Sequence, residues 1–131
     1  MAVRSLRQVM YPISDLAVAV EFYRDTMGLP LVAEFDPPGL AFFDLDGVRL
    51  LLEQSDAVPS SGTIYLSVEN VDAETERLRS AGVPITGEPH LIHRDDAGVF
   101  GAPGTEDWMS FVVDPFGNTI GLSERRVAPT D

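Results

Sequence analysis

The fold is decided by the stretch Gln8-Val-Met-Tyr-Pro-Ile-Ser-Asp-Leu, which is followed by Phe22-Tyr-Arg-Asp-Thr-Met-Gly-Leu-Pro. About 55 positions later the pattern returns as Thr63-Ile-Tyr-Leu-Ser-Val-Glu-Asn-Val, followed by Leu78-Arg-Ser-Ala-Gly-Val-Pro. A second repeat, about 70 positions apart, joins Phe43-Asp-Leu-Asp-Gly-Val-Arg-Leu-Leu-Leu to Val113-Asp-Pro-Phe-Gly-Asn-Thr-Ile-Gly-Leu. The chain is therefore predicted to contain one structural unit twice.

Each copy predicts the element order βαβββ, because alternating apolar residues indicate strands and apolar residues three and four apart indicate a helix. In the first copy we expect a helix over 15–27, ended by Gly28, and strands over 6–13, 31–35, 40–45 and 48–54. In the second copy we expect a helix over 71–81, ended by Gly82, and strands over 63–68, 85–94, 108–113 and 118–123. The pair Asp46-Gly47 predicts a tight hairpin between two of these strands.

These elements predict a single domain over residues 1–131, with a first module over 6–54 and a second over 63–124. The proline and serine content of residues 55–62 is typical of a linker, and residues 125–131 are expected to be a frayed tail. Either module alone would bury too little apolar surface for a stable fold, so the two should share a core layer or a partner. The long glycine-containing stretch 95–107 predicts a lid or a disordered loop.

Composition excludes several classes of function. Cysteine is absent, so disulfides and thiolate metal sites are excluded, as expected in a reducing compartment. The sequence shows no charged leader with an apolar run and no apolar stretch of membrane length, so we expect a cytoplasmic protein without membrane partners. The net charge of −12, with only 9 scattered basic residues, argues against nucleic acid as a partner, although it would attract a cationic ligand.

Two βαβββ modules with Phe22-Tyr23-Arg24-Asp25 ahead of Met27-Gly28-Leu29, and with the ending Asp114-Pro115-Phe116-Gly117-Asn118, resemble the vicinal oxygen chelate superfamily. This superfamily includes glyoxalase I, bleomycin resistance proteins, fosfomycin-inactivating enzymes, methylmalonyl-CoA epimerase and extradiol dioxygenases. The resemblance covers residues 6–124 and implies an α+β fold in which the curved sheets of the two modules form an open cup, usually within a homodimer. Such a fold does not by itself assign an activity.

The same resemblance implies a divalent metal in the cup, with ligands on the first and last strand of each module. Matching the strands places these positions at Gln8, Leu51, Thr63 and Gly121, which the two repeats also pair with one another. A hard cation needs several carboxylate, imidazole or amide donors that converge on one point, and here only Gln8 is a plausible donor. We therefore expect no cofactor; the alternative is a divalent metal bound by ligands at positions other than these.

Strand alternation predicts the lining of the cup. The candidates for ligand binding are Gln8, Met10, Arg49, Leu51, Glu53, Thr63, Tyr65, Trp108 and Gly121. Further candidates for aromatic walls are Phe42, Phe43 and Phe100. Since Arg49 and Glu53 share a face, they either pair with each other or bind a polar group of the ligand.

Few residues are candidates for catalysis. His93 and Glu53 are the candidates for an acid or base. His90 and His93 are three apart on a predicted strand, so their side chains should point to opposite faces and cannot chelate a metal together without a bulge. Asp44 and Asp114, at equivalent shoulders of two turns, are assigned to turn structure.

Two classes of function remain. The first is a metal-free binding module, a homodimer that holds a small organic molecule, aromatic or cationic, much as bleomycin resistance proteins sequester a drug. The second is an enzyme of the same superfamily, a lyase, isomerase or dioxygenase that acts on a small oxygenated substrate.

Overall fold

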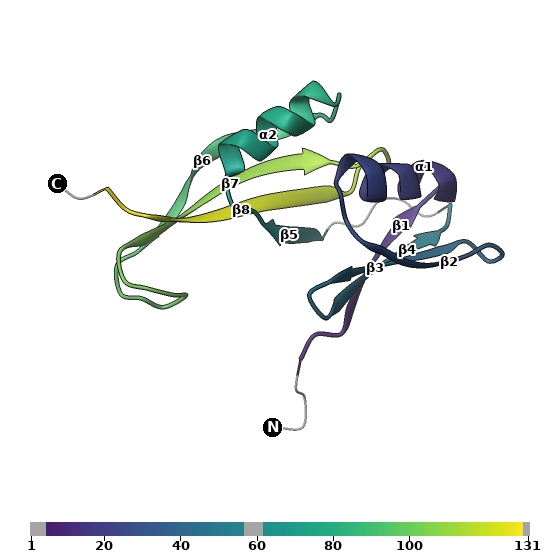
Figure 1. The fold of residues 1–131 in the computed structure, drawn as a ribbon, viewed down its shortest axis with the longest axis horizontal. Coiled ribbons are helices and arrows are strands. Elements are labelled where there is room, and N and C mark those ends of the chain that lie inside the picture. Colours follow the sequence, from purple (N-terminus) through teal and green to yellow (C-terminus); the bar gives the residue numbers. More distant parts are fainter. Residues whose placement is uncertain (1–4, 57–61, 130–131) are drawn as a thin grey trace. The chain divides into compact units, whose positions relative to one another are not determined.

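The computed structural model describes residues 5–56 and 62–129, and its elements follow the order βαβββ twice (Figure 1). The chain forms two compact units. The first holds the described residues up to Asp56 together with the turn Pro115–Asn118, and the second holds Gly62–Asp114 with the residues from Thr119 onward. The predicted α+β architecture of two βαβββ modules is confirmed. Of the predicted linker, residues 57–61 lie outside the described part of the chain.

The sheet of the first unit has the strand order β1-β4-β3-β2, with β1 parallel to β4 and the other neighbours antiparallel. Its elements are β1 Gln8–Ile13, α1 Leu16–Val20, the π-helical turn η1 Glu21–Thr26, β2 Leu31–Phe35, β3 Leu40–Leu45 and β4 Val48–Gln54. The hairpin between β3 and β4 turns at Asp46 and Gly47, both with positive φ, as the sequence predicts. Asp44 accepts a hydrogen bond from the Gly47 N–H at 3.2 Å, which confirms its role in the turn.

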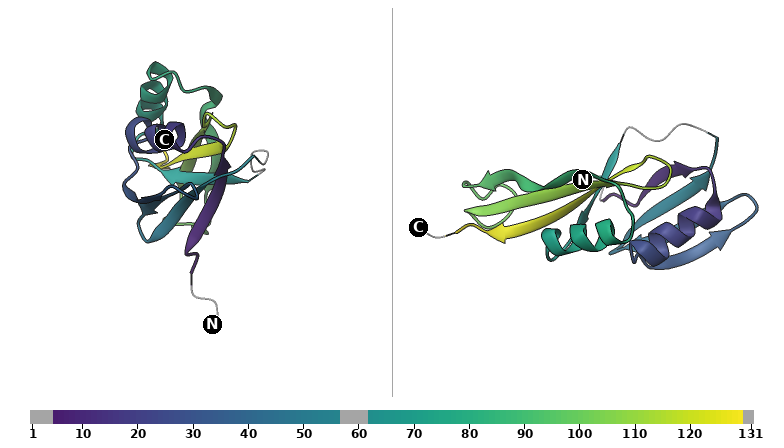
Figure 2. Two further views of the ribbon diagram at one scale, coloured as in Figure 1. Left: turned by 90° about the vertical axis from the view of Figure 1, so that its right-hand side faces the viewer. Right: turned by 90° about the horizontal axis from the view of Figure 1, so that it is seen from above.

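The sheet of the second unit repeats this arrangement in the order β5-β8-β7-β6, with β5 parallel to β8. Its elements are β5 Thr63–Ser67, α2 Val71–Ser80, β6 Ile85–Asp95, β7 Thr105–Val113 and β8 Thr119–Val127. Both β7 and β8 extend beyond their predicted bounds, because Thr105–Trp108 pairs with the end of β8. The three-stranded ribbon thus continues past α2 (Figure 2), and β8 reaches into the stretch for which a tail is predicted.

In each unit one face of the sheet packs against the helix and forms the core. On that face of the first unit lie Tyr11, Ile13, Phe43, Leu50 and Leu52, all buried beneath α1 and η1. On that face of the second unit lie Ser110, Val112, Ile120 and Leu122, all buried, as are Val71 and Leu78 of α2. The opposite face of each sheet is not covered by its unit's helix, and we call it the open face.

The two helices are capped in the same way, which reveals the duplication at the level of single hydrogen bonds. Asp15 accepts from the Val18 N–H at 3.1 Å, and Asn70 accepts from the Ala73 N–H at 3.0 Å, as N-cap side chains do. The last strand of each sheet supplies a second acceptor. Gln54 Oε1 accepts from the Leu16 N–H at 3.2 Å, and Glu124 Oε1 accepts from the Val71 N–H at 2.7 Å.

The helices differ by one residue, and the difference explains η1. From Tyr23 to Gly28 the first copy has one more residue than the second has from Leu78 to Gly82. A π-helical turn accommodates such an extra residue within a helix, and the Met27 N–H indeed donates to the Phe22 carbonyl, five residues back, at 2.8 Å. The predicted continuous α-helix over 15–27 is therefore α-helical only as far as Val20. Among the described residues, no helix is long and apolar enough to cross a membrane.

Candidate functional site

The open face of the first unit carries five of the predicted ligand-binding residues. Strand register places Gln8 and Met10 of β1 beside Arg49 and Leu51 of β4, with Glu53 further along the same strand. Phe42 of β3 lies opposite Leu51 and contacts Phe35 edge to face, with ring centroids 6.0 Å apart. The result is an apolar surface, on which Met10 is 47% exposed, that carries the cationic Arg49 and the anionic Glu53, with Asp44 opposite Arg49 at its edge.

Arg49 is held by Gln8. Its Nε donates to Gln8 Oε1 at 3.0 Å, across the parallel pair of β1 and β4. The predicted alternative, an Arg49–Glu53 pair, does not form, and within the described residues Glu53 makes no ion pair. Because amide and guanidinium fix each other, the cationic group has a defined position on the open face.

The open face of the second unit is an aromatic surface built on glycine. Tyr65 of β5 and Phe111 of β7 flank Gly121 of β8, and their rings stand edge to face, 6.2 Å apart. A Cβ atom at position 121 would lie 2.7 Å from Tyr65 Cδ1 and 3.2 Å from Phe111 Cε1. Gly121 therefore provides the space in which these two rings lie against the strand. Tyr65 is nevertheless 59% exposed, and Thr63 lies on the same face, paired with Thr119.

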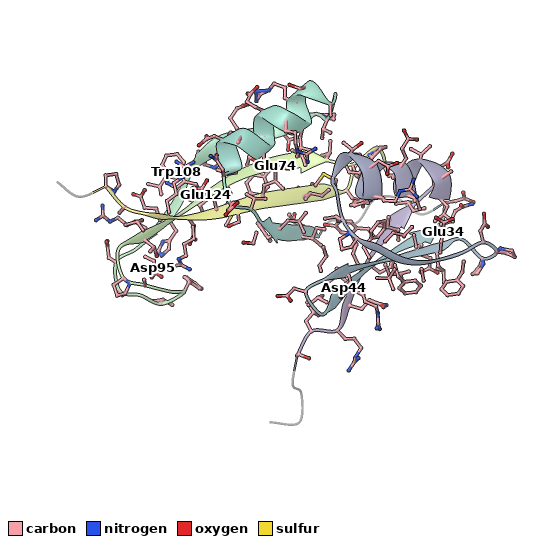
Figure 3. The ribbon with its side chains drawn as sticks, in the orientation of Figure 1. Glu34, Asp44, Glu74, Asp95, Trp108 and Glu124 are labelled. Atoms are coloured by element: carbon pink, nitrogen blue, oxygen red, sulfur yellow. The ribbon has the colours of Figure 1, made fainter. Side chains whose placement is uncertain are left out.

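Trp108 lies on the other side of this sheet, so the expectation that it lines the cup is wrong in its placement. Trp108 pairs with Glu124, whose carboxylate caps α2, and both side chains lie near α2 (Figure 3). The indole N–H donates to Glu106 at 3.1 Å, and the Arg126 guanidinium stacks on the ring at 4.3 Å. Phe43 also belongs to the helix-covered face, where it is fully buried. Trp108 and Phe43 therefore lie on the helix-covered faces and not on the open faces.

The two histidines lie on one face, contrary to the prediction from alternation. The register of β6 shifts between Leu91 and His93, so that His90 pairs with Met109 and His93 with Asp107. Met109 and Asp107 alternate with Phe111 along β7, so they lie on the open face with it. His90 contacts Phe111, with ring centroids 6.5 Å apart, and its Nδ1 lies 2.7 Å from the Glu88 carbonyl oxygen. The bulge reverses the alternation for the second histidine.

Residues 96–104 form a loop that buried Asp95 holds in place. Asp95, only 1% exposed, accepts from the N–H groups of Val99 and Phe100 at 2.7 and 2.9 Å and from Arg125 at 2.5 Å. Arg125 also donates to the Phe100 carbonyl oxygen at 2.8 Å. Burial would raise the pKa of Asp95, but the two N–H donors, Arg125 and nearby His93 together hold that pKa below its usual value.

This loop turns away from α2, toward the open side of the sheet (Figure 1). At its tip Phe100 is 71% exposed and packs edge to face on His93, 6.0 Å away. The anchored part is shorter than the predicted stretch 95–107, because Thr105–Asp107 belongs to β7. Closure of this loop over a ligand stays a prediction.

Sequence reasoning did not select Phe111, Asp95 or Arg125. Phe111 could have been found by counting back along β7 from Val113, since alternate residues share a face. No local sequence pattern identifies Asp95 as an anchor of the loop. Its partners are backbone groups of the following loop and the side chain of Arg125, about 30 positions away. The catalytic candidates His93 and Glu53 lie on the open faces of different units.

The positions that the resemblance assigns to a metal do not provide its ligands. Gln8 already accepts from a guanidinium, Leu51 has no donor atom, Thr63 offers a neutral hydroxyl, and Gly121 lies beneath two aromatic rings. Within residues 5–56 and 62–129, no group of three histidine, aspartate or glutamate side chains is arranged to hold a metal ion. The residues present therefore do not fit a divalent cation.

A family model that describes the glyoxalase/bleomycin resistance protein/dioxygenase superfamily matches residues 5–122. The chain belongs to this superfamily. Among solved structures, a superfamily member from Sphaerobacter thermophilus is 21% identical with a TM-score of 0.72, over 95% of this chain and 99% of the other. The lactoylglutathione lyase of Agrobacterium tumefaciens is 24% identical with a TM-score of 0.68, over 95% and 96% of the two chains. At such identities these structures establish a superfamily fold and no activity.

A curated protein to which part of the chain is similar is the metallothiol transferase FosB of Staphylococcus haemolyticus. It is 30% identical over 63 residues. The matched segment spans 48% of this chain and 44% of the length of FosB, so less than half of either protein is compared.

Proposed function

We propose that this protein binds a small organic molecule on the open faces of its sheets, without a metal, and sequesters it rather than transforming it. The observation that carries this proposal is the aromatic pair Tyr65 and Phe111, set against Gly121 on a face that the helix of its unit leaves uncovered. The exposed Tyr65 ring and the half-buried Phe111 ring, both on strands of the sheet, offer a planar ligand contact area at little entropic cost.

The polar groups around these apolar surfaces support a binding role. Ligand sites are mostly apolar, with a few placed polar groups that fix the orientation of the ligand. Arg49 and Glu53 are such groups in the first unit, and the Tyr65 hydroxyl and His90 are such groups in the second. A ligand with an aromatic ring and at least one polar substituent fits this chemistry.

The proposal is tested by a thermal-shift screen of aromatic compounds, because a ligand that binds only the folded protein raises its melting temperature. Compounds that stabilise the wild type should lose affinity for Tyr65→Ala. Val18→Ala removes a comparably exposed apolar side chain from α1 and is the matched control. The proposal fails if no compound stabilises the protein, or if Tyr65→Ala and Val18→Ala bind hits equally well.

The metal-free part of the proposal has its own test. A metal-dependent lyase, isomerase, dioxygenase or thiol transferase is the second candidate, and the partial similarity to FosB favours it. Elemental analysis of protein purified without chelators separates the two, with less than about 0.1 equivalents of any transition metal expected from the lack of donors. Stoichiometric zinc, nickel, iron or manganese after gel filtration would favour the enzyme.

The proposed binding protein is a homodimer. Its sheets end in the edge strands β1 and β2 in the first unit and β5 and β6 in the second, and association covers such edges in many proteins. Multi-angle light scattering at micromolar concentration should give twice the mass of 14.3 kDa. A single species at the monomer mass contradicts this part of the proposal.

A further inference from the structure

Arg49 differs from most of the described arginines in its partner. The sequence holds 21 acidic and 9 basic residues, so carboxylates are abundant. Six of the described arginines form ion pairs with them, and these are Arg24, Arg77, Arg79, Arg94, Arg125 and Arg126. Arg49, although half-buried on an apolar face, instead donates to the neutral amide of Gln8.

The acidic groups nearest to Arg49 do not neutralise it. Asp44 lies directly opposite on β3, yet its carboxylate accepts from the Gly47 N–H, and no ion pair joins it to Arg49 in the described part of the chain. Glu53 stands four residues along β4, about 13 Å away by strand geometry. The charge of Arg49 is therefore held in position without being compensated.

The bond to Gln8 also leaves the binding end of the guanidinium available. Only Nε is engaged, and the structure gives the two terminal nitrogens no acceptor among residues 5–56 and 62–129. These nitrogens form the planar fork that binds a carboxylate through two parallel hydrogen bonds. Met10 and Leu51 lie beside Arg49 in the register, so a bound carboxylate would continue into apolar contacts.

We propose that Arg49 binds the carboxylate of an aromatic organic acid, with Gln8 as the residue that positions it. This assignment rests on the proposed binding function and names the class of its ligand. Gln8, the position at which the superfamily resemblance implies a metal ligand, thus orients the Arg49 guanidinium. The positive charge of this guanidinium takes the place of a metal ion in attracting an anionic oxygen. In a protein of net charge −12, such a local cation discriminates acids from neutral analogues by contact rather than by steering.

Three probes of one shape test the assignment by isothermal titration calorimetry at pH 7, and they are phenylacetate, phenylacetamide and phenethylamine. Wild type should bind phenylacetate about tenfold more tightly than phenylacetamide, since a hydrogen bond to a charged group contributes more than one to a neutral group. Arg49→Met should abolish this preference, and Arg49→Lys, which keeps the charge without the fork, should retain part of it. Gln8→Ala should reduce the preference while the melting temperature stays within a few degrees.

Arg24→Met is the matched control, because Arg24 belongs to the same unit but pairs with Asp25. It should bind all three probes as wild type does. Equal binding of phenylacetate and phenylacetamide by wild type, or an unchanged preference in Arg49→Met, overturns the assignment and leaves ligand binding intact. If wild type binds none of the three probes, this assignment is overturned, whereas the proposed function is decided separately by the thermal-shift screen.

Discussion

Replacing Gly121 with alanine should weaken ligand binding more than folding. The new Cβ would lie 2.7 Å from Tyr65 Cδ1, whereas carbon atoms in contact prefer about 3.5–4.0 Å, so the Tyr65 ring has to retreat by about 1 Å. Overpacking of this kind costs about 1–3 kcal/mol in a closed core. Tyr65 is exposed and can turn outward, so we expect the lower end of that range.

A second effect of the same substitution acts in the opposite direction. Alanine restricts the unfolded chain and so stabilises the fold by about 0.4–1 kcal/mol where the backbone allows it. Gly121 has no left-handed φ, so its backbone accepts an L-residue. The net loss of unfolding free energy is about 0–1 kcal/mol, and the melting temperature should fall by no more than about 4 °C.

The effect on affinity follows from the displaced ring. One aromatic contact contributes about 0.5–1.5 kcal/mol beyond its buried area, so affinity for an aromatic ligand should fall about two- to twelvefold. Calorimetry on Gly121→Ala, Tyr65→Ala and the double variant gives the test. Because both changes act through one ring, the double variant should bind no more weakly than Tyr65→Ala. The reasoning is refuted if a folded Gly121→Ala variant binds the ligand as tightly as wild type. It is also refuted if the double variant loses as much affinity as the two single variants combined.

Two further predictions concern buried hydrogen bonds. Thr75 Oγ1 lies 2.5 Å from the Val71 carbonyl oxygen and 2.8 Å from Ser110 Oγ, and both hydroxyls are buried between α2 and β7. Thr75→Val would leave the buried Ser110 hydroxyl without this hydrogen-bond partner. The free energy of unfolding, measured in urea, should therefore fall by about 1–3 kcal/mol. Adding Ser110→Ala should recover part of that loss; a double variant that loses the sum of both single effects contradicts the pairing. The lowered pKa of Asp95 means that its carboxylate stabilises the fold above the usual aspartate pKa and loses this effect as pH falls through the lowered pKa. Melting temperatures of wild type and Asp95→Asn should therefore converge from pH 7 toward pH 2, and a difference independent of pH counts against this role.

The element order and the two open faces could be predicted because their signals are local and repeated. Strands such as Leu40–Leu45 and Val48–Gln54 have the predicted bounds, since they lie on either side of Asp46-Gly47. The placement of Gln8, Arg49 and Leu51 on one face follows from alternation, and their register confirms it. One copy of the duplication also supported the assignment of the other.

The parts that sequence reasoning missed depend on departures from regular periods. The bulge before His93 shifts the alternation of a strand by one residue, and the π-helical turn at η1 shifts the period of a helix by one residue. No particular residue type predicts such a shift. The extension of β8 to Val127 is polar and shows no apolar alternation, since ion pairs of Arg125 with Asp95 and of Arg126 with Asp72 join it to other elements. Trp108 lies two residues from Ser110 along β7 and so shares the helix-covered face, a placement that follows from strand alternation and not from its aromatic character.

The anchoring of residues 96–104 by Asp95 bears on how a ligand would contact Phe100. A ring on a disordered loop has to be immobilised when it binds, and each such side chain costs about 0.5–1.5 kcal/mol of conformational entropy. Here the Phe100 and Val99 N–H groups and the Phe100 carbonyl oxygen are already bound to Asp95 and Arg125. The backbone that carries this exposed ring is thus ordered before any ligand arrives, so an aromatic group that reaches Phe100 would have to immobilise the ring but not the loop.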